Sequence, residues 1–149
     1  MNWNSIKQNF DDDGALVDIY YEGMSDDRWL KLFSWLRAHE NLESVNCYDP
    51  IKDQNLEYIP ETIQDILNQK GFYCFVSLQV KGISISFRFY EKTELECDVS
   101  PNEIDCEAKV NTLLNILASV QNVVSASRYI ICPENCKKGA FNINGEFVS

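Results

Sequence analysis

The sequence contains few of the residues and motifs on which most catalytic sites depend. It has one histidine, His39, and no G-x-S-x-G motif, so no standard Ser/His/Asp arrangement is recognisable. Its six glycines follow neither P-loop nor Rossmann spacing, which argues against a nucleotide-binding enzyme. His39 lies near the end of a predicted helix, where an imidazole favourably faces the negative end of the helix dipole. We therefore expect no catalytic residues, and a protein that is not an enzyme.

Long apolar segments are also missing. The first ten residues, MNWNSIKQNF, contain no apolar signal core, and no run of 18 apolar residues occurs. These absences predict a cytoplasmic protein that is neither secreted nor associated with a membrane. In that compartment the six cysteines are expected to be reduced and mostly buried, with Cys74 and Cys97 on apolar strand faces.

Two segments start a metal-binding pattern without completing it. The segment NFDDDG at 9–14 resembles the first half of a calcium loop, but Tyr20 occupies the position that should hold a bidentate glutamate. Cys132 and Cys136 are separated by three residues, which fits neither a redox Cys-x-x-Cys motif nor the common zinc knuckle. We therefore predict no metal and no other cofactor.

Negative charge is what the chain has in excess. The net charge is −10, and 45% of the 149 residues are hydrophobic, which is typical of one packed domain spanning 1–149. Residues 11–27 contain seven carboxylates and no cation, and residues 91–107 contain seven carboxylates and one lysine. These two windows together carry −13, so the rest of the chain carries +3. Such regional acidity disfavours nucleic acid and anionic membranes as partners and favours a basic protein.

The clearest structural signal is the run 72–99, which predicts three consecutive antiparallel strands. Apolar and polar residues alternate in each strand, as they do when one face of a sheet is buried. The third strand places Glu94, Glu96 and Asp98 on its solvent face. Two explanations fit these charges, namely a surface that binds a partner and an edge strand that charge protects from aggregation.

The flanking segments predict elements that cover this meander. Alternation predicts strands and 3.6-residue periodicity predicts helices, while Asn144-Gly145 between apolar residues predicts a short hairpin. A capping box of Ser100 and Glu103 marks the start of the last helix. The predicted elements are strands near 15–22, 44–48 and 127–132 and helices near 25–38, 60–70 and 101–121. The fold class is therefore α+β, with a mostly antiparallel central sheet in a single domain.

The acidic windows supply the candidate partner-binding residues. Surfaces that bind a basic protein commonly combine tyrosine with carboxylates. A carboxylate pair on one strand face would serve acid–base chemistry only in a pocket that separates the two pKa values. The candidates are Asp11, Asp12, Asp13, Tyr90, Glu91, Glu94, Glu96 and Asp98.

The overall pattern resembles the bacterial immunity proteins of polymorphic or contact-dependent toxin systems. The features that carry the resemblance are the small acidic α+β chain, the strand-helix start, the meander with an acidic third strand, the capped long helix and the late strand ending in CPEN at 132–135. The resemblance implies stoichiometric binding of a cognate toxin in the cytoplasm. Many such toxins are basic nucleases, which an acidic inhibitor would meet quickly through electrostatic steering.

Two other functions are compatible with the sequence. The first is a small enzyme or ligand-binding protein with a non-standard site lined by Tyr, Glu and Cys. A deep pocket with converging polar groups would favour it, and a filled core with shallow grooves would count against it. The second is an adaptor or homo-oligomer that uses its sheet edge, which the mass in solution would reveal.

Overall fold

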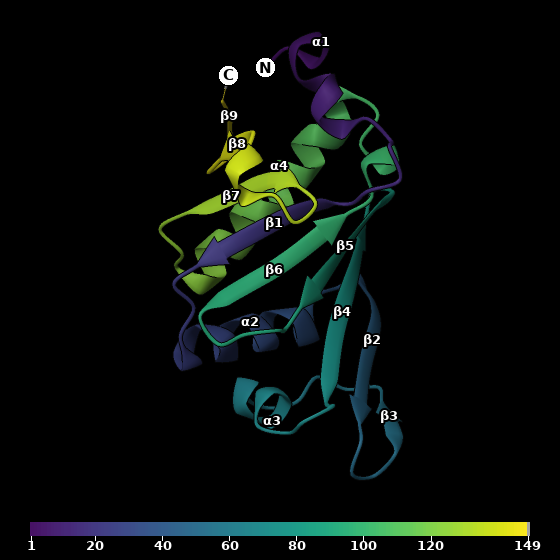
Figure 1. The fold of residues 1–149 in the computed structure, drawn as a ribbon, viewed down its shortest axis with the longest axis vertical. Coiled ribbons are helices and arrows are strands. Elements are labelled where there is room, and N and C mark those ends of the chain that lie inside the picture. Colours follow the sequence, from purple (N-terminus) through teal and green to yellow (C-terminus); the bar gives the residue numbers. More distant parts are fainter. Residues whose placement is uncertain (149) are drawn as a thin grey trace.

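A nine-stranded antiparallel sheet is the frame of the protein in the computed structural model, which describes residues 1–148 (Figure 1). The strands are β1 (Val17–Glu22), β2 (Leu42–Asp49), β3 (Gln54–Leu56), β4 (Tyr73–Val80), β5 (Ile83–Arg88), β6 (Glu94–Val99), β7 (Tyr129–Pro133), β8 (Asn142–Ile143) and β9 (Glu146–Phe147). Their order is β3-β2-β4-β5-β6-β1-β7-β8-β9. The first strand of the chain therefore lies inside the sheet, between β6 and β7.

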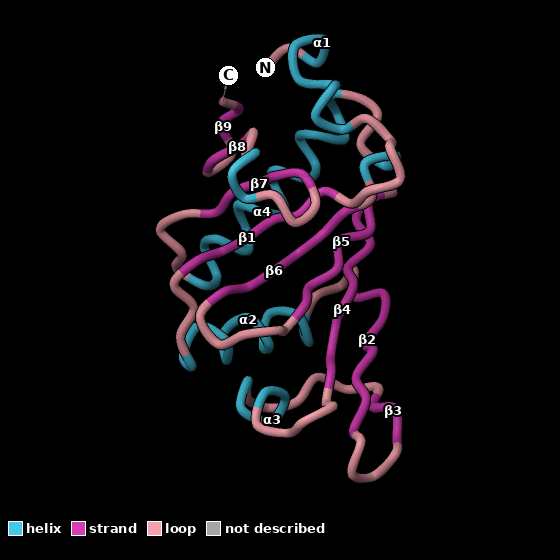
Figure 2. Tube along the Cα trace, viewed as in Figure 1, coloured by secondary structure: helices cyan, strands magenta, loops and turns pink. Residues whose placement is uncertain are grey.

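The helices lie mainly on one side of this sheet. They are α1 (Trp3–Ile6), α2 (Asp26–Ala38), α3 (Ile63–Leu67) and α4 (Glu107–Val124), with 3-10 turns η1 (Lys7–Phe10), η2 (Pro101–Glu103) and η3 (Lys137–Gly139). The two long helices, α2 and α4, contact each other and lie behind the sheet in the view of Figures 1 and 2. The opposite face of β5, β6 and β1 consequently faces the viewer. The α+β class, with helices packed on a mostly antiparallel sheet, is as the sequence predicts.

Strand alternation explains how the core forms. In β1, Val17, Ile19 and Tyr21 point toward the helices, and the last two are fully buried. The hydroxyl of Tyr21 donates a hydrogen bond of 2.6 Å to the backbone carbonyl of Leu117 in α4. This bond satisfies the only polar atom that the ring carries into the core. The helix layer is thus tied to the central strand of the sheet.

Helix α2 follows the predicted pattern. Ser25 caps it by accepting a hydrogen bond from the backbone N–H of Arg28, and its apolar stripe, which runs from Trp29 to Leu36, is buried. The indole Nε1 of Trp29 donates a 2.7 Å hydrogen bond to the backbone carbonyl of Lys92. Because Lys92 lies in the loop between β5 and β6, the core helix holds that loop in place.

The long helix begins later than the sequence predicts. The expected start at residue 101 and the capping box are wrong, because Pro101–Glu103 forms a 3-10 turn and α4 runs from Glu107 to Val124. The carboxylate of Glu103 accepts a hydrogen bond from the backbone N–H of Ser84 at 3.3 Å, so it is not available to cap Ser100. Ile104 is buried just after the turn, whereas Cys106, which immediately precedes α4, is exposed.

The region 54–70 also differs in detail. The helix near 60–70 is shortened to α3, and a reciprocal capping box between Thr62 and Asp65 starts it rather than Pro60. The polar segment before Pro60 contains the three-residue strand β3, which the sequence does not predict. The short hairpin at Asn144-Gly145 is confirmed as β8 and β9.

The cysteines depart from the expectation that all are reduced and mostly buried. Cys47 in β2 and Cys74 in β4 are directly opposite in the strand register and are joined by a disulfide. Of the four free thiols, Cys106 and Cys136 are exposed. The pairing follows from the register of β2 with β4, which brings together residues that are 27 positions apart in the chain.

The three-stranded meander is confirmed as β4, β5 and β6, but β6 is not an edge strand. It pairs with β5 on one side and with β1 on the other. Protection of a sheet edge therefore does not explain its three carboxylates, and Asp98 is 6% exposed rather than solvated. The charges of β6 lie in the middle of the sheet, on the face that α2 and α4 leave uncovered.

Candidate protein-binding surface

The uncovered sheet face brings two acidic strands side by side. The register of β1 with β6 places Asp18 opposite Asp98 and Glu22 opposite Glu94. Like charges that lie directly opposite on neighbouring strands destabilise a sheet. The charges must therefore be balanced by other groups, and the structure shows how this is done.

Arg88 of β5 balances one member of the first pair. Its guanidinium Nε donates a hydrogen bond to Asp98, whose side chain is 8% exposed. The guanidinium carbon of Arg88 also lies 5.1 Å from the centre of the Phe75 ring. Asp98 raises the pKa of the Arg88 guanidinium, which burial opposes. Asp18 accepts hydrogen bonds from the backbone N–H of Asn135 at 2.8 Å and from the Tyr20 hydroxyl at 3.1 Å.

Lys137 of η3 balances the second pair. Its ammonium group is 2.6 Å from a carboxylate oxygen of Glu94 and 4.5 Å from the centre of the Tyr20 ring. The hydrogen bond to Glu94 raises the pKa of Lys137. This segment also covers a small apolar cluster of Tyr20, Ile130 and Cys132 on the same face. A cation is thus already held on this face by a carboxylate and an aromatic ring.

Glu96 lies between these balanced pairs and has no such partner. It faces Tyr20 on one side and Arg88 on the other, yet no hydrogen bond or ion pair within residues 1–148 reaches its carboxylate. Partial burial raises the pKa of Glu96, and the neighbouring carboxylates of Asp18 and Asp98 raise it further, whereas Arg88 opposes the shift. Burial likewise raises the pKa of Asp18. Among the described residues, the face carries Asp18, Glu96 and Asp98 but only Arg88 as a cation beside them, so carboxylates outnumber cations there.

These residues surround a hollow of about 430 Å³, which we call the acidic hollow. Its lining residues are Leu16, Asp18, Arg88, Tyr90, Glu96, Asp98, Glu134 and Asn135. Small-molecule sites of this size are mostly apolar, whereas four carboxylates and one cation line this one. The lining is therefore suited to a cationic group.

The sequence-predicted candidates are only partly brought together. Tyr90, Glu96 and Asp98 line the acidic hollow, and Glu94 lies beside it in its ion pair with Lys137. Glu91 is exposed in the adjoining loop, where its carboxylate accepts a hydrogen bond from Thr93.

The aspartates at 11–13 form a separate exposed turn before β1. Carboxylates of Asp12 and Asp13 accept hydrogen bonds from the backbone N–H groups of Gly14 and Ala15, as in a turn that needs no metal. Asp11 and Asp13 line a second hollow, which shares Leu16 and Glu134 with the acidic hollow. The two acidic windows of the sequence thus meet near Glu134.

Several residues of the surface are not among the sequence candidates, and they include Asp18, Tyr20, Arg88 and Glu134. Asp18 lies within the first acidic window. Knowing that β1 pairs with β6 would have been enough to place it opposite Asp98. Glu134 comes from the loop after β7, and its Oε2 accepts a 3.3 Å hydrogen bond from the backbone N–H of Leu16. The sequence does not indicate that contact.

The Cys132 thiol and the Tyr20 hydroxyl, which lie beside the carboxylates, are held in their protonated forms. Burial raises the pKa of the Cys132 thiol to about 11, and Asp18 contributes to that shift. Burial, together with Asp18 and Glu96, raises the pKa of the Tyr20 hydroxyl. Because the thiolate is the reactive form of cysteine, the thiol nearest the carboxylates is a poor nucleophile at neutral pH. The arrangement favours binding over covalent catalysis.

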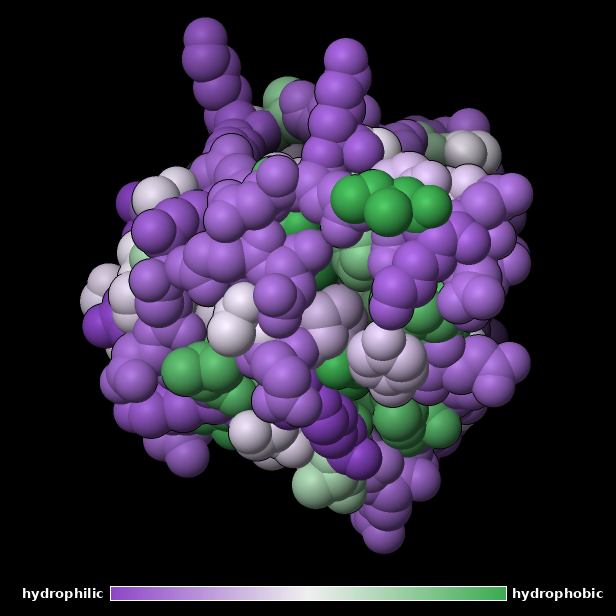
Figure 3. All heavy atoms as spheres, turned by 90° about the horizontal axis from the view of Figure 1, so that it is seen from below, coloured by the Kyte–Doolittle hydropathy of each residue, from purple (hydrophilic) through white to green (hydrophobic). Residues whose placement is uncertain are grey.

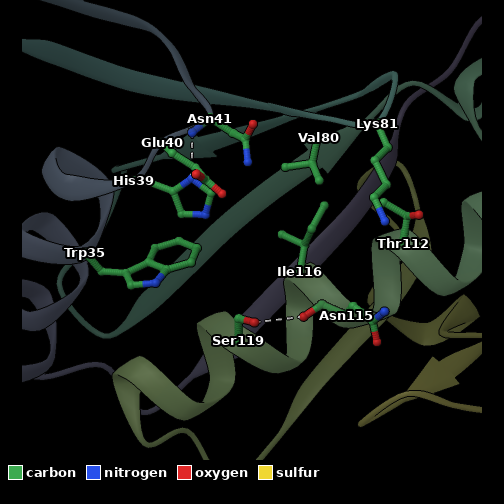
Figure 4. Close-up of a pocket in the computed structure, with 10 residues that line it drawn as sticks. All are labelled: Trp35, His39, Glu40, Asn41, Val80, Lys81, Thr112, Asn115, Ile116 and Ser119. Carbon is green, nitrogen blue, oxygen red and sulfur yellow. Dashed lines mark hydrogen bonds between the residues drawn. The ribbon is translucent and has the colours of Figure 1, made fainter.

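A smaller groove lies between α2, the end of β4 and α4 (Figure 4). Its volume is about 220 Å³, below the range typical of small-molecule sites. Trp35 and His39 stand at one side with ring centres 4.7 Å apart, and the backbone N–H of Asn41 donates to Nδ1 of His39 at 3.0 Å. His39 ends α2, which agrees with its predicted capping position. No carboxylate accepts a hydrogen bond from His39 among the described residues, so the groove holds no Ser/His/Asp-type relay.

The lower end of the molecule in Figure 1 is seen face-on in Figure 3, where hydrophilic side chains surround separate hydrophobic groups. Exposed apolar residues of that region include Ile51, Tyr58 and Tyr73, and Tyr73 stacks on Tyr48 with ring centres 5.6 Å apart. Within residues 1–148, no three His, Cys, Asp or Glu side chains converge as a metal site. None of the helices described is long and apolar enough to span a membrane.

Comparison with known proteins gives a likeness of fold. No family model matches the sequence, and no curated protein is detectably similar to it. The structure is similar to a chain of the 1.75 Å crystal structure of the toxic C-terminal tip of CdiA from Pseudomonas aeruginosa in complex with immune protein. The TM-score is 0.57 at 15% sequence identity, and the alignment covers 90% of this chain and 97% of that one. The likeness shows that this chain shares its fold with one chain of that complex.

Proposed function

We propose that this protein neutralises a cognate protein toxin by stoichiometric binding, as an immunity protein does. The observation that carries the proposal is the uncovered sheet face, where Asp18, Glu96 and Asp98 concentrate negative charge that Arg88 only partly balances. The likeness in fold to a chain of a toxin and immune-protein complex supports the same function. Neighbouring carboxylates in the middle of a sheet lower the stability of the fold. Binding of a basic partner would explain why the protein keeps them.

The partner is a basic protein, and the encounter takes place in the cytoplasm. A net charge of −10 raises the rate of association with a cationic surface and disfavours nucleic acid as the ligand. The contact surface extends from the acidic hollow across Tyr90, Glu91 and Glu94 to the turn at Asp11, Asp12 and Asp13. Glu134 connects these parts, since it lines both hollows.

The test is reconstitution with the cognate toxin domain, which is to be sought in the genes that neighbour this one. The purified proteins should form a 1:1 complex in solution, and toxin activity should fall to zero when one molecule of this protein is present per toxin. Inactivation at a small fraction of that ratio would mean that the protein modifies the toxin enzymatically. Absence of a complex would contradict the proposal altogether.

Salt dependence and charge reversal test the surface itself. The association rate should fall steeply as ionic strength rises, because screening shortens the reach of the surface charges to about 8 Å at 0.15 M salt. Glu91→Lys, at an exposed position beside the hollow, should slow association, and Glu57→Lys provides the matched control. Glu57 is exposed in the segment after β3, remote in the sheet order from β6 and β1. Equal rates for the two variants would exclude the acidic face as the docking surface.

A further inference from the structure

We propose that the acidic hollow receives an arginine side chain of the toxin, with its guanidinium between Glu96 and Glu134 and against the ring of Tyr90. This inference rests on the proposed function and names the chemical group that the surface recognises. It treats the uncovered face of β6 and β1 as a docking surface for a basic loop. Three independent features of the structure lead to it.

The first feature is that the chain already binds one cation of its own on this face. Lys137 contacts the carboxylate of Glu94 and the face of Tyr20, at 2.6 Å and 4.5 Å respectively. A carboxylate combined with an aromatic face is a favourable site for a cation. Glu96 and Tyr90 offer the same two kinds of group in the hollow next to it. Arg88 lies directly opposite Glu96 but forms its ion pair with Asp98, and no ion pair within residues 1–148 reaches Glu96.

The second feature is that the hollow has a fixed acidic floor. Asp18 and Asp98 are 2% and 6% exposed, and both are held by hydrogen bonds to Asn135, Tyr20 and Arg88. Because these hydrogen bonds hold both side chains in place before binding, Asp18 and Asp98 lose little conformational entropy when a partner binds. Glu96, with its free carboxylate, stands above this floor.

The third feature is that the carboxylate acceptors surround the hollow from several sides, which favours arginine over lysine. The carboxylates come from three elements, namely β1, β6 and the loop after β7. A guanidinium presents five N–H donors in a planar fork and stacks on aromatic rings, whereas an ammonium is a compact point charge. The Tyr90 side chain interacts with Arg88, yet Tyr90 is 61% exposed at the rim, so the exposed part of its ring can cover an inserted planar group. Arg88, stacked on Phe75, is an example of this mode within the same sheet.

The experiment has two arms. In the first, binding of the cognate toxin domain to the full chain is measured for the wild type and for Glu96→Gln, Tyr90→Ala and Tyr90→Phe, with Glu57→Gln as control. Glu96→Gln and Tyr90→Ala should each raise the Kd on the order of 10- to 100-fold, the range for loss of a hot-spot contact. Tyr90→Phe keeps the ring and should recover most of the affinity, and Glu57→Gln should match the wild type.

In the second arm, hexa-arginine and hexa-lysine peptides are titrated into the isotope-labelled protein and followed by NMR. Hexa-arginine should bind more tightly, and its amide shifts should centre on Tyr90, Glu96 and Glu134 and vanish in Glu96→Gln. Equal binding of the two peptides, or shifts centred elsewhere, would overturn the inference. If the toxin binds and Glu96→Gln leaves its Kd unchanged, the hollow is not the arginine site although the proposed function stands. If no toxin binds and hexa-arginine occupies the hollow, the proposed function fails and the chemistry of the hollow is supported.

Discussion

Replacing Glu96 by glutamine should stabilise the folded protein while it weakens toxin binding. Ionised Glu96 is partly buried beside Asp18 and Asp98. Arg88 lies opposite it, but no ion pair within residues 1–148 reaches its carboxylate. The burial and the neighbouring charges raise its pKa above the ordinary value of 4.5. Glutamine has nearly the same shape and no charge, so it removes the repulsion without leaving a cavity.

The pH dependence gives the sign of the effect. Because the pKa of Glu96 is raised in the folded state, the folded chain holds this proton more tightly than the unfolded chain does. The contribution of Glu96 to stability is therefore fully present below its unfolded pKa and is lost as pH rises through its folded pKa. The gain from Glu96→Gln should be close to zero at pH 4 and reach its full size at pH 7.

The size of the gain follows from the neighbours of Glu96 on the sheet face. Tyr20 and Arg88 lie directly opposite Glu96, so the like charges are Asp98 on the same strand and Asp18 diagonally across. Interactions between neighbouring side chains on one sheet face are worth about 0.5 to 1 kcal/mol. For a protein of this length, that change corresponds to a rise in Tm of about 1 to 4 °C. Thermal unfolding of the wild type, Glu96→Gln and the exposed control Glu57→Gln at pH 4 and pH 7 measures it. A lower Tm for Glu96→Gln than for the control at pH 7 would refute the reasoning, because the carboxylate would then contribute favourably to the fold.

Three further outcomes follow from the contacts of the sheet. Arg88→Ala leaves the buried carboxylate of Asp98 without its ion-pair partner, so the free energy of unfolding should fall by about 3 kcal/mol. Urea denaturation measures this change. A loss below about 1 kcal/mol would contradict the role given to this ion pair. Trp29→Phe keeps most of the ring but removes the hydrogen bond to the loop between β5 and β6, so hydrogen exchange in that loop should speed up and toxin association should slow. Alkylation of the unfolded, unreduced protein should modify four cysteines, and modification of all six would show that Cys47 and Cys74 are not joined.

Local patterns in the sequence predict the elements of this fold well where one face of a strand or helix is buried. The meander at 72–99, the strand near 15–22 and the helix near 25–38 all follow from alternation or 3.6-residue spacing. The start of α4 could not be predicted in this way. Ser100 and Glu103 match a capping box, but Glu103 bonds to Ser84, a neighbour that only the packed sheet brings close.

The candidate surface was predictable in its composition and not in its geometry. Glu96 and Asp98 were recognisable as outward-facing carboxylates, since their positions in β6 follow from alternation. That β6 is central depends on the insertion of β1 between β6 and β7, which is a property of strand order. The contact of Glu134 with Leu16 depends on the same insertion. Strand order is set by long-range packing, so the local pattern of charge could not decide between a binding surface and a protected edge for these residues.

The central place of the acidic strands distinguishes a binding role from a solubility role. Carboxylates that serve only solubility are expected at exposed positions, where water screens them at little cost. Here Asp18 and Asp98 are directly opposite and almost fully buried, and the chain uses Arg88, Tyr20 and a backbone N–H to hold them there. Proteins commonly retain groups that lower stability where activity requires them. If Glu96→Gln raises the Tm and also raises the Kd for the toxin, the same carboxylate will have been shown to oppose folding and to favour binding, which a charge retained for solubility would not do.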